Sequence, residues 1–392
     1  MENWYDCDLG EVKETEKRIK VVGIGGGGGN TLNSLYKKFM DPSQNLSMDG
    51  IDFIIINSDS QDLTKSPIPN KIQIAEDGQG AGSDPQLGKE YAEKHEQRIS
   101  DALRKAYMIF ITAGMGGGTG TGAAPVVARL ARKANPGALI IGVVTTPFTS
   151  TRNVKKMQVA LEGIEKLKTE VNALLIVSND SIMKLFPNSA MYEEALRATD
   201  KVLMNAITGI VGIIKNVGNQ NADFRDVYNI MKEAGTDVII GVGSATGPDR
   251  YQKALDDALN SPLLCSRTIN GARGIIVNFC TSKGKSDLNG VNYVRNSLYA
   301  LADPKANYKD CTTEDKSMGD MLMLTVIATD FVDERGNYVT YMNRVVAEQG
   351  IKTASNDNDS EEKEKEEEVK ESVLNVKVPD FSIPTFIRAK RR

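Results

Sequence analysis

Two glycine-rich segments constrain the fold most strongly, because each directly follows a run of apolar and β-branched residues. The run IKVVGIG leads into GIGGGGGN (Gly23–Asn30), and the run MIFITAG leads into MGGGTGTGAAP (Met115–Pro125). Glycine is favoured where the chain takes a positive φ and where another group must approach the backbone closely. Strands that end in such turns before a helix are typical of α/β folds with parallel sheets.

Three further apolar runs, IDFIIINSD, ALIIGVVTT and NALLIVSND, alternate with stretches that have helical spacing. Near-continuous runs of this kind are expected for strands buried on both faces of a parallel sheet. After the second glycine segment, four apolar residues follow one helix face: Val127, Leu130, Ala131 and Ala134. We expect this helix to open at Ala123. The pattern predicts an α/β, doubly wound parallel-sheet domain.

A long helical stretch from about Tyr192 to Lys215 precedes a second set of apolar runs, VIIGVGSATG, ARGIIVNFC and MLMLTVIATDF. We interpret this set as a smaller α/β domain joined to the first by the long helix. Residues 357–371 (DNDSEEKEKEEEVKE) are strongly acidic and carry too few apolar residues to bury a core. The sequence therefore predicts a disordered C-terminal linker, followed by a short tail peptide.

Composition excludes several classes of protein. The 392 residues carry a net charge of −4, which argues against nucleic acid as the main partner, since phosphates require a basic face. No apolar run approaches the roughly 20 residues of a membrane helix, and the polar N-terminus does not resemble a secretory signal. Four scattered cysteines and one histidine, His95, disfavour a Cys/His metal site, so we expect no metal bound by the protein and free thiols in a reducing cytosol.

The two glycine turns predict a ligand site, because the carboxyl ends of parallel strands meet at one edge of a sheet. Backbone N–H groups and helix dipoles from two turns suit a triphosphate, and Thr119 and Thr121 add hydroxyl donors. The first turn alone also fits the dinucleotide fingerprint of NAD-type oxidoreductases, an alternative that leaves the second turn without a role. No Walker A motif is present: the nearest candidate, Gly82–Glu90, has one residue too many and no Ser or Thr after its Lys.

GGGTGTG at Gly116–Gly122 resembles the signature of the tubulin/FtsZ family, and the chain resembles FtsZ proteins from about Ile19 to Arg344 and over its last dozen residues. Supporting segments are NSDSQDL, GQGAGSDPQLG, TTPF, SND, NADFRDV, SPLL and GARGIIVN. The resemblance implies a bacterial GTPase that binds GTP and GDP, with Mg²⁺ held through phosphates and water. It also implies head-to-tail filaments that build the cell-division ring.

The resemblance also names the domains and their boundaries. These are an N-terminal extension (1–18), a GTP-binding domain (19–191), a central helix (192–216), an activation domain with the catalytic loop (217–345), a disordered acidic linker (346–378) and a C-terminal binding peptide (379–392).

Nucleotide contacts are implied for residues that match the family's loops. They are Gly26, Gly27, Gly28, Gly29 and Asn30 in the first phosphate loop; Gly80, Ala81 and Gly82 in the loop that senses the terminal phosphate; Gly117, Gly118, Thr119, Gly120, Thr121 and Gly122 in the signature; and Lys156, Asn179 and Asp200 elsewhere. At Asp200 the family recognises guanine, and a carboxylate can accept hydrogen bonds from the guanine N1–H and 2-amino groups, which adenine lacks. Spacing alone favours a solvated helix charge at this position.

Three polar residues of NADFRDV, namely Asn221, Asp223 and Asp226, are candidates for catalysis. Taken alone, Asn221 fits a helix N-cap, and Asp223 complements the helix dipole. Two acids three residues apart can also polarise or deprotonate an attacking water. In the family pattern this loop reaches the nucleotide of the next subunit, so that hydrolysis depends on assembly, much as a GAP supplies a group in trans.

The segment PFTSTRNVKKM departs from the family pattern. Thr151, or Arg152 if the extra residue is placed earlier, stands where the family has Glu, and Lys156 stands for an Arg. Leu196 replaces an aromatic residue that commonly stacks on guanine. Lysine keeps the charge but loses the bidentate fork of arginine. These departures motivate an alternative: a divergent nucleotide-binding tubulin homologue that acts as an assembly or regulatory partner with slow hydrolysis.

The terminal peptide VPDFSIPTFIRAKRR combines apolar anchors with a basic end on an acidic tether. Composition alone favours a frayed terminus. However, the peptide resembles the FtsZ C-terminal peptide, which implies docking on membrane adaptors of the FtsA type and on other division proteins. The implied contacts are Phe381, Ile383, Pro384, Phe386, Ile387 and Arg388. The resemblance thus implies a cytoplasmic protein at the division site beneath the inner membrane, with no membrane span of its own.

Overall fold

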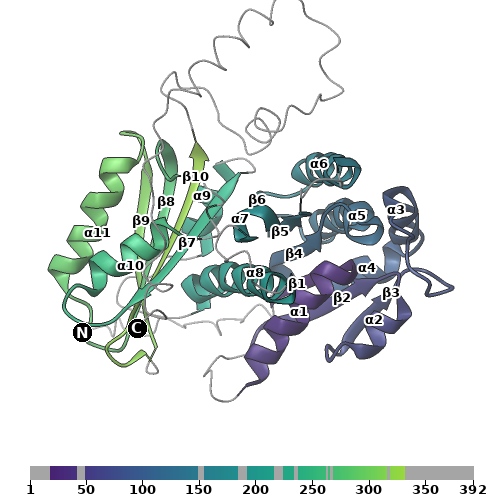
Figure 1. Ribbon diagram of the computed structural model, residues 1–392, viewed down its shortest axis with the longest axis horizontal. Helices are drawn as coiled ribbons and strands as arrows, with labels where there is room; N and C mark the ends of the chain where they lie inside the picture. Colours follow the sequence, from purple (N-terminus) through teal and green to yellow (C-terminus); the bar gives the residue numbers. More distant parts are fainter. Residues whose placement is uncertain are drawn as a thin grey trace, which may run out of the picture.

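The computed structural model describes residues 18–41, 49–148, 154–183, 192–215, 224–233, 237–261, 264, 268–315 and 318–331. Within these ranges two sheets lie on either side of one long helix, α8 (Tyr192–Lys215), as Figure 1 shows. Residues 1–17, the predicted acidic linker and the terminal peptide fall outside the described residues.

The first sheet has six parallel strands in the order β3-β2-β1-β4-β5-β6. The strands are β1 (Arg18–Ile24), β2 (Ile51–Asn57), β3 (Asn70–Gln73), β4 (Ala106–Gly114), β5 (Leu139–Thr146) and β6 (Ala173–Ser178). The five apolar runs form five of these strands, which confirms the predicted doubly wound sheet. Because the strand order reverses between β1 and β4, a ligand crevice is expected at the carboxyl ends of these two strands.

Helices cover both faces of the first sheet. One face packs on α3, α4, α5 and α6, and the other packs on α1, α2, α7 and α8. Their bounds are α1 (Gly25–Met40), α2 (Ser60–Lys65), α3 (Pro85–Lys94), α4 (Glu96–Leu103), α5 (Gly118–Ala134), α6 (Val154–Lys168) and α7 (Asn179–Met183). Burial of both faces explains why the strands are almost continuously apolar.

Both glycine-rich segments are largely helical, which corrects the expectation that a helix opens at Ala123. Helix α5 begins at Gly118, and α1 begins at Gly25. Glycine in a helix interior costs about 1 kcal/mol relative to alanine, but close packing requires it here. A Cβ on Gly28 would lie 2.2 Å from the Thr112 carbonyl oxygen.

The second sheet has the order β7-β10-β8-β9, with β10 antiparallel to β7 and β8, and β9 parallel to β8. Its strands are β7 (Val238–Ala245), β8 (Ala272–Thr281), β9 (Asn307–Glu314) and β10 (Leu322–Phe331). Helices α10 (Arg250–Leu259) and α11 (Leu288–Leu301) pack on one face, and α9 (Phe224–Glu233) packs against β8 and β10. The three predicted apolar runs form β7, β8 and β10.

Helix α8 is central to the core, as predicted. One apolar cluster contains Ile141 of β5, Ile207 of α8 and Ile276 of β8, so the two sheets share a core around this helix. No helix in the described part of the chain is long and apolar enough to cross a membrane.

Candidate functional site: a nucleotide crevice

Two helix N-termini meet at the carboxyl ends of β1 and β4. The first turns of α1 and α5 touch each other, since a Cβ on Gly25 would lie 3.0 Å from the Gly120 nitrogen, and α1 also touches the end of β4, since a Cβ on Gly27 would lie 3.2 Å from the Gly114 Cα. Neither helix has a side-chain hydrogen bond at its N-cap or an acidic residue in its first turn. The N–H groups and positive dipole ends of both helices are therefore directed at one place, which suits an anion.

Three glycines around this place face open space. Among the described residues, a Cβ added to Gly80, Gly82 or Gly117 would have no atom within 4 Å. Gly80 and Gly82 have positive φ angles of 86° and 54°, which by themselves account for glycine. Gly117 has a φ of −96° and a ψ of 179°, which any residue can adopt. Neither backbone strain nor packing against the described residues requires glycine at Gly117, so this position leaves room for close approach of a ligand.

Other glycines of the signature pack against the protein itself. A Cβ on Gly118 would lie 2.8 Å from the Asp84 nitrogen and 2.9 Å from the Ala81 Cβ, and one on Gly120 would lie 2.5 Å from the Gly114 oxygen. These glycines hold the loops together. Phosphate contacts through their backbone N–H groups stay a prediction.

The predicted phosphate-sensing loop is joined to the signature helix through Ser58, which follows β2. The Gly80 N–H donates to the Ser58 carbonyl oxygen at 3.1 Å, and the Ser58 and Thr119 hydroxyl oxygens lie 2.5 Å apart. Thr121 is buried, and its hydroxyl accepts a hydrogen bond from the Gly116 N–H. The structure thus brings both predicted loops together, and it uses the Thr121 hydroxyl within the signature turn.

Asp200 lies on α8 and faces α1. Its Oδ1 accepts a hydrogen bond of 2.7 Å from the Thr31 hydroxyl. Burial raises the pKa of the Asp200 carboxyl above its usual value, and the hydrogen bond from Thr31 acts in the opposite direction. Asp200 is therefore a half-buried, oriented acceptor and not a fully solvated helix charge.

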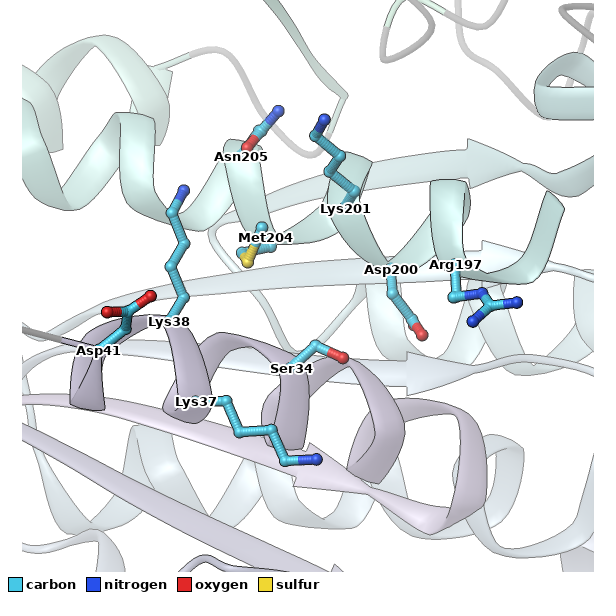
Figure 2. A pocket seen from close by; sticks show the side chains of 9 residues that line it. All are labelled: Ser34, Lys37, Lys38, Asp41, Arg197, Asp200, Lys201, Met204 and Asn205. Atoms are coloured by element: carbon cyan, nitrogen blue, oxygen red, sulfur yellow. The ribbon is translucent and has the colours of Figure 1, made fainter. Parts of the chain in front are cut away.

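A cavity of about 550 Å³ opens between α1 and α8 beside Asp200 (Figure 2). It is lined by Ser34, Lys37, Lys38, Asp41, Arg197, Asp200, Lys201, Met204 and Asn205. Burial and the nearby Lys201 lower the pKa of Lys38. The lining contains four basic and two acidic side chains, so the cavity favours a ligand with negative charge.

Two further predicted contacts lie on neighbouring elements. Lys156 is exposed in the first turn of α6, and its carbonyl oxygen would lie 2.9 Å from a Cβ on Gly116, so this turn touches the signature. Asn179, directly after β6, is buried, and its Oδ1 has no hydrogen-bond partner among the described residues. This acceptor therefore suits a polar group of a ligand. Thr151 and Arg152 lie outside the described residues, as does the side chain of Leu196.

Of the predicted catalytic residues, only Asp226 lies within the described chain, in the first turn of α9. Asn221 and Asp223 lie outside it. The Asp226 Oδ2 forms an ion pair with the Lys309 Nζ of β9 at 2.8 Å. Sequence reasoning missed Lys309, because no pattern links a polar edge strand to this helix. Asp226 lies on α9, which packs against β8 and β10 of the second sheet, whereas the glycine-rich segments follow β1 and β4 of the first sheet.

Comparison with known proteins identifies the family. Residues 18–187 match the family described as "Tubulin/FtsZ family, GTPase domain", and residues 236–332 match "FtsZ family, C-terminal domain". The empty FtsZ dimer of M. jannaschii is 34% identical, with a TM-score of 0.71, and the match covers 81% of this chain and 89% of that one. The GTPγS-bound protofilament of CetZ2 from Haloferax volcanii is 19% identical, with a TM-score of 0.67, and the match covers 83% of this chain and 97% of that one. At this identity the similarity shows the fold alone. The chain is a member of the FtsZ family and contains the tubulin/FtsZ GTPase domain.

Proposed function

We propose that this protein is a GTP-dependent, self-assembling GTPase whose head-to-tail filaments form the cell-division ring, with GTP hydrolysed at subunit interfaces. The observation that carries the proposal is the meeting of two uncapped helix N-termini beside the open Gly117, within the family's GTPase domain. Backbone donors from two helices match the oxygens of a nucleotide triphosphate.

Three further side chains are proposed to contact the nucleotide. Lys156, in the turn that touches the signature, supplies positive charge for the phosphates. Asn179 offers to a donor on the nucleotide its Oδ1, which has no partner among the described residues, and Asp200 accepts hydrogen bonds from guanine. Among the described residues, no group of three or more His, Cys, Asp or Glu side chains forms a metal site. Mg²⁺ would therefore bind through phosphate oxygens and water, a common mode for this ion.

Hydrolysis is proposed to need a second subunit. Asp226 lies on α9 beside the second sheet, and the glycine-rich segments follow strands of the first sheet. An acid carried there can act on a nucleotide held by another copy of the chain. Asp223 and Asp226 would polarise or deprotonate the attacking water, with Asn221 in the same loop. The M. jannaschii FtsZ structure is a dimer, which supports self-association in this family.

The proposal is tested by measuring the GTPase rate per subunit against protein concentration, beside light scattering. We expect the specific rate to rise at the concentration where scattering begins. A specific rate that stays constant through the onset of assembly would assign hydrolysis to the single chain. GTP binding without any assembly would contradict the proposal that the protein forms filaments.

One observation favours the second candidate, an assembly or regulatory homologue with slow hydrolysis. Lys156 lies at the signature turn where the family has an arginine, and a lysine cannot form the bidentate contact. Phosphate release separates the two candidates. The division-ring GTPase releases phosphate continuously as it assembles, and the slow homologue assembles with almost no release.

The partner and location are proposed from the terminal peptide, which lies outside the described residues. We propose that Phe381, Ile383, Pro384, Phe386, Ile387 and Arg388 dock on a membrane adaptor of the FtsA type and hold filaments in the cytoplasm beneath the inner membrane. Nucleic acid is not a partner in this proposal.

A further inference from the structure

Thr31 lies where the base-recognising part of the crevice meets the phosphate-binding part. It belongs to the second turn of α1 and is only 1% exposed. Its Oγ1 lies 2.7 Å from the Asp200 Oδ1 and 3.3 Å from the Gly27 carbonyl oxygen. Gly27 belongs to the first turn of α1, whereas Asp200 belongs to α8, so one side chain bridges two elements.

A threonine hydroxyl has a single hydrogen and can make one full donation. Both neighbours of the Thr31 hydroxyl are acceptors when Asp200 is ionised. The shorter distance and the charge of the carboxylate assign the hydrogen to Asp200, because hydrogen bonds to ionised groups are the stronger ones. Thr31 thereby fixes the position of Oδ1 and the rotation of the carboxylate.

We propose that Thr31 is a positioning residue for base recognition: its hydroxyl holds Asp200 so that the carboxylate presents acceptors to both guanine donors. This inference rests on the proposed function, which assigns Asp200 to the base. Guanine offers its N1–H and its 2-amino group side by side, whereas hypoxanthine offers only N1–H. A carboxylate free to rotate presents this double acceptor for less of the time. Thr31 thus sets the preference for guanine over hypoxanthine.

The charge of Asp200 responds to the same contact. A protonated Asp200 presents a hydroxyl where guanine needs an acceptor, so binding is lost as the pH falls through the pKa of this group. Burial raises that pKa, and the Thr31 hydrogen bond opposes the rise. Loss of the hydroxyl therefore moves the acid limit of binding to a higher pH. The other charged groups around the cavity are Lys37, Lys38 and Asp41 on α1 and Arg197 and Lys201 on α8; they are unchanged in a Thr31 variant.

The test uses the full chain and measures dissociation constants for GDP and inosine diphosphate from neutral to mildly acidic pH. Thr31→Val removes the hydroxyl at nearly constant volume, Thr31→Ser keeps it, and Thr169→Val is a matched control at the exposed end of α6, where the hydroxyl donates to the Lys166 carbonyl oxygen. We expect Thr31→Val to weaken GDP binding by about tenfold and to reduce the preference for GDP over inosine diphosphate. The pH below which GDP binding is lost should also rise. Thr31→Ser and Thr169→Val should stay close to the wild type.

The inference would be overturned if Thr31→Val lost equal affinity for GDP and inosine diphosphate while the pH below which binding is lost stayed the same. Thr31 would then contribute only to packing. Melting temperatures are measured in parallel, and Thr31→Ala is the second hydroxyl-free variant if Thr31→Val does not fold. Asp200→Asn tests base recognition by Asp200 separately from the positioning role of Thr31. This variant should lose guanine and gain xanthine nucleotides, because the amide can donate to the 2-oxo group. If Asp200→Asn keeps the preference for GDP, Asp200 does not recognise the base and the proposed assignment fails. If Asp200→Asn loses this preference but Thr31→Val keeps it, Asp200 recognises the base without help from Thr31.

Discussion

The Lys309 Nζ lies 2.8 Å from the Asp226 Oδ2 and ties the first turn of α9 to strand β9. Both side chains are about one third exposed, at 38% and 35%. A solvent-exposed ion pair contributes only about 0–1 kcal/mol to stability. The main effect of this contact is therefore on the position of the carboxylate.

We expect Lys309→Met to lower GTP turnover in filaments by about tenfold, short of the hundredfold or larger loss expected when the carboxylate itself is removed. Without the Lys309 ion pair, Asp226 samples more rotamers and is aligned with the attacking water for less of the time. The measurement is kcat at a protein concentration where assembly is complete. Lys309→Arg keeps the charge and should recover most of the turnover. Wild-type turnover in Lys309→Met would show that Asp226 needs no help from β9.

Alanine at Asp223 or Asp226 should leave nucleotide binding intact and remove most hydrolysis, by about a hundredfold or more. If the acids act on the neighbouring subunit, a minor fraction of either variant mixed into wild-type protein should depress turnover more than dilution does. The rate is measured across a series of mixing ratios at constant total protein. A strictly linear decline would argue against an active site shared between subunits.

Gly117 and Gly118 should respond differently to valine. At Gly117 the new side chain enters open space, so Gly117→Val should abolish GDP binding and leave the melting temperature nearly unchanged. At Gly118 the Cβ would lie 2.8 Å from the Asp84 nitrogen, so Gly118→Val should also lower the melting temperature. Binding by titration and thermal unfolding are measured on both proteins. Normal GDP affinity in Gly117→Val would remove this glycine from the nucleotide site.

Lys156→Arg should tighten GTP binding by about 1 kcal/mol, because a guanidinium contacts phosphate through two parallel hydrogen bonds. Lys155→Arg, on the adjacent exposed residue, is the matched control and should have no effect. The same comparison is made with Thr151→Glu added. Unchanged or weaker affinity in both Lys156→Arg proteins would show that the crevice contacts the phosphates by another route.

Removal of Phe381–Arg392 should leave the GTPase rate and light scattering nearly unchanged but abolish adaptor binding and ring localisation in cells. Phe386→Ala alone should have most of this effect, since one aromatic anchor commonly dominates the affinity of a short peptide. Membrane-attached rings formed by the truncated protein, in cells without the full-length copy, would contradict the role of the peptide.

The strands could be predicted wherever burial on both faces demands a continuous apolar run, as in β1, β4 and β8. β3 and β9 were not predicted, for two reasons. β3 has only four residues, and β9 (NYKDCTTE) is a polar strand at a sheet edge, where one side needs no apolar partner. The start of α5 was misplaced because glycine has low helix propensity, and only the tertiary contacts of Gly120 and Gly122 explain it there.

The meeting of the two glycine-rich segments could be predicted from the sequence, because each segment directly follows a strand and the carboxyl ends of parallel strands meet at one edge of the sheet. The side-chain contacts of the site could not. Thr31 and Asp200 are separated by 169 residues, and neither lies in a spacing that marks the other. Lys309 likewise carries no motif, and only the packing of α9 beside the second sheet brings it to Asp226.

The core shared across α8 makes the two halves of the chain thermodynamically inseparable. Ile141, Ile207 and Ile276 belong to one cluster, so the second sheet cannot open without exposing the apolar face of the first. We expect amides in the middle of β8 to exchange with solvent deuterium through global opening. A nucleotide that binds only the native state suppresses that opening by mass action. We therefore expect GDP, if it binds at the ends of β1 and β4 as proposed, to slow deuterium uptake in β8, a strand that does not carry the glycine-rich segments.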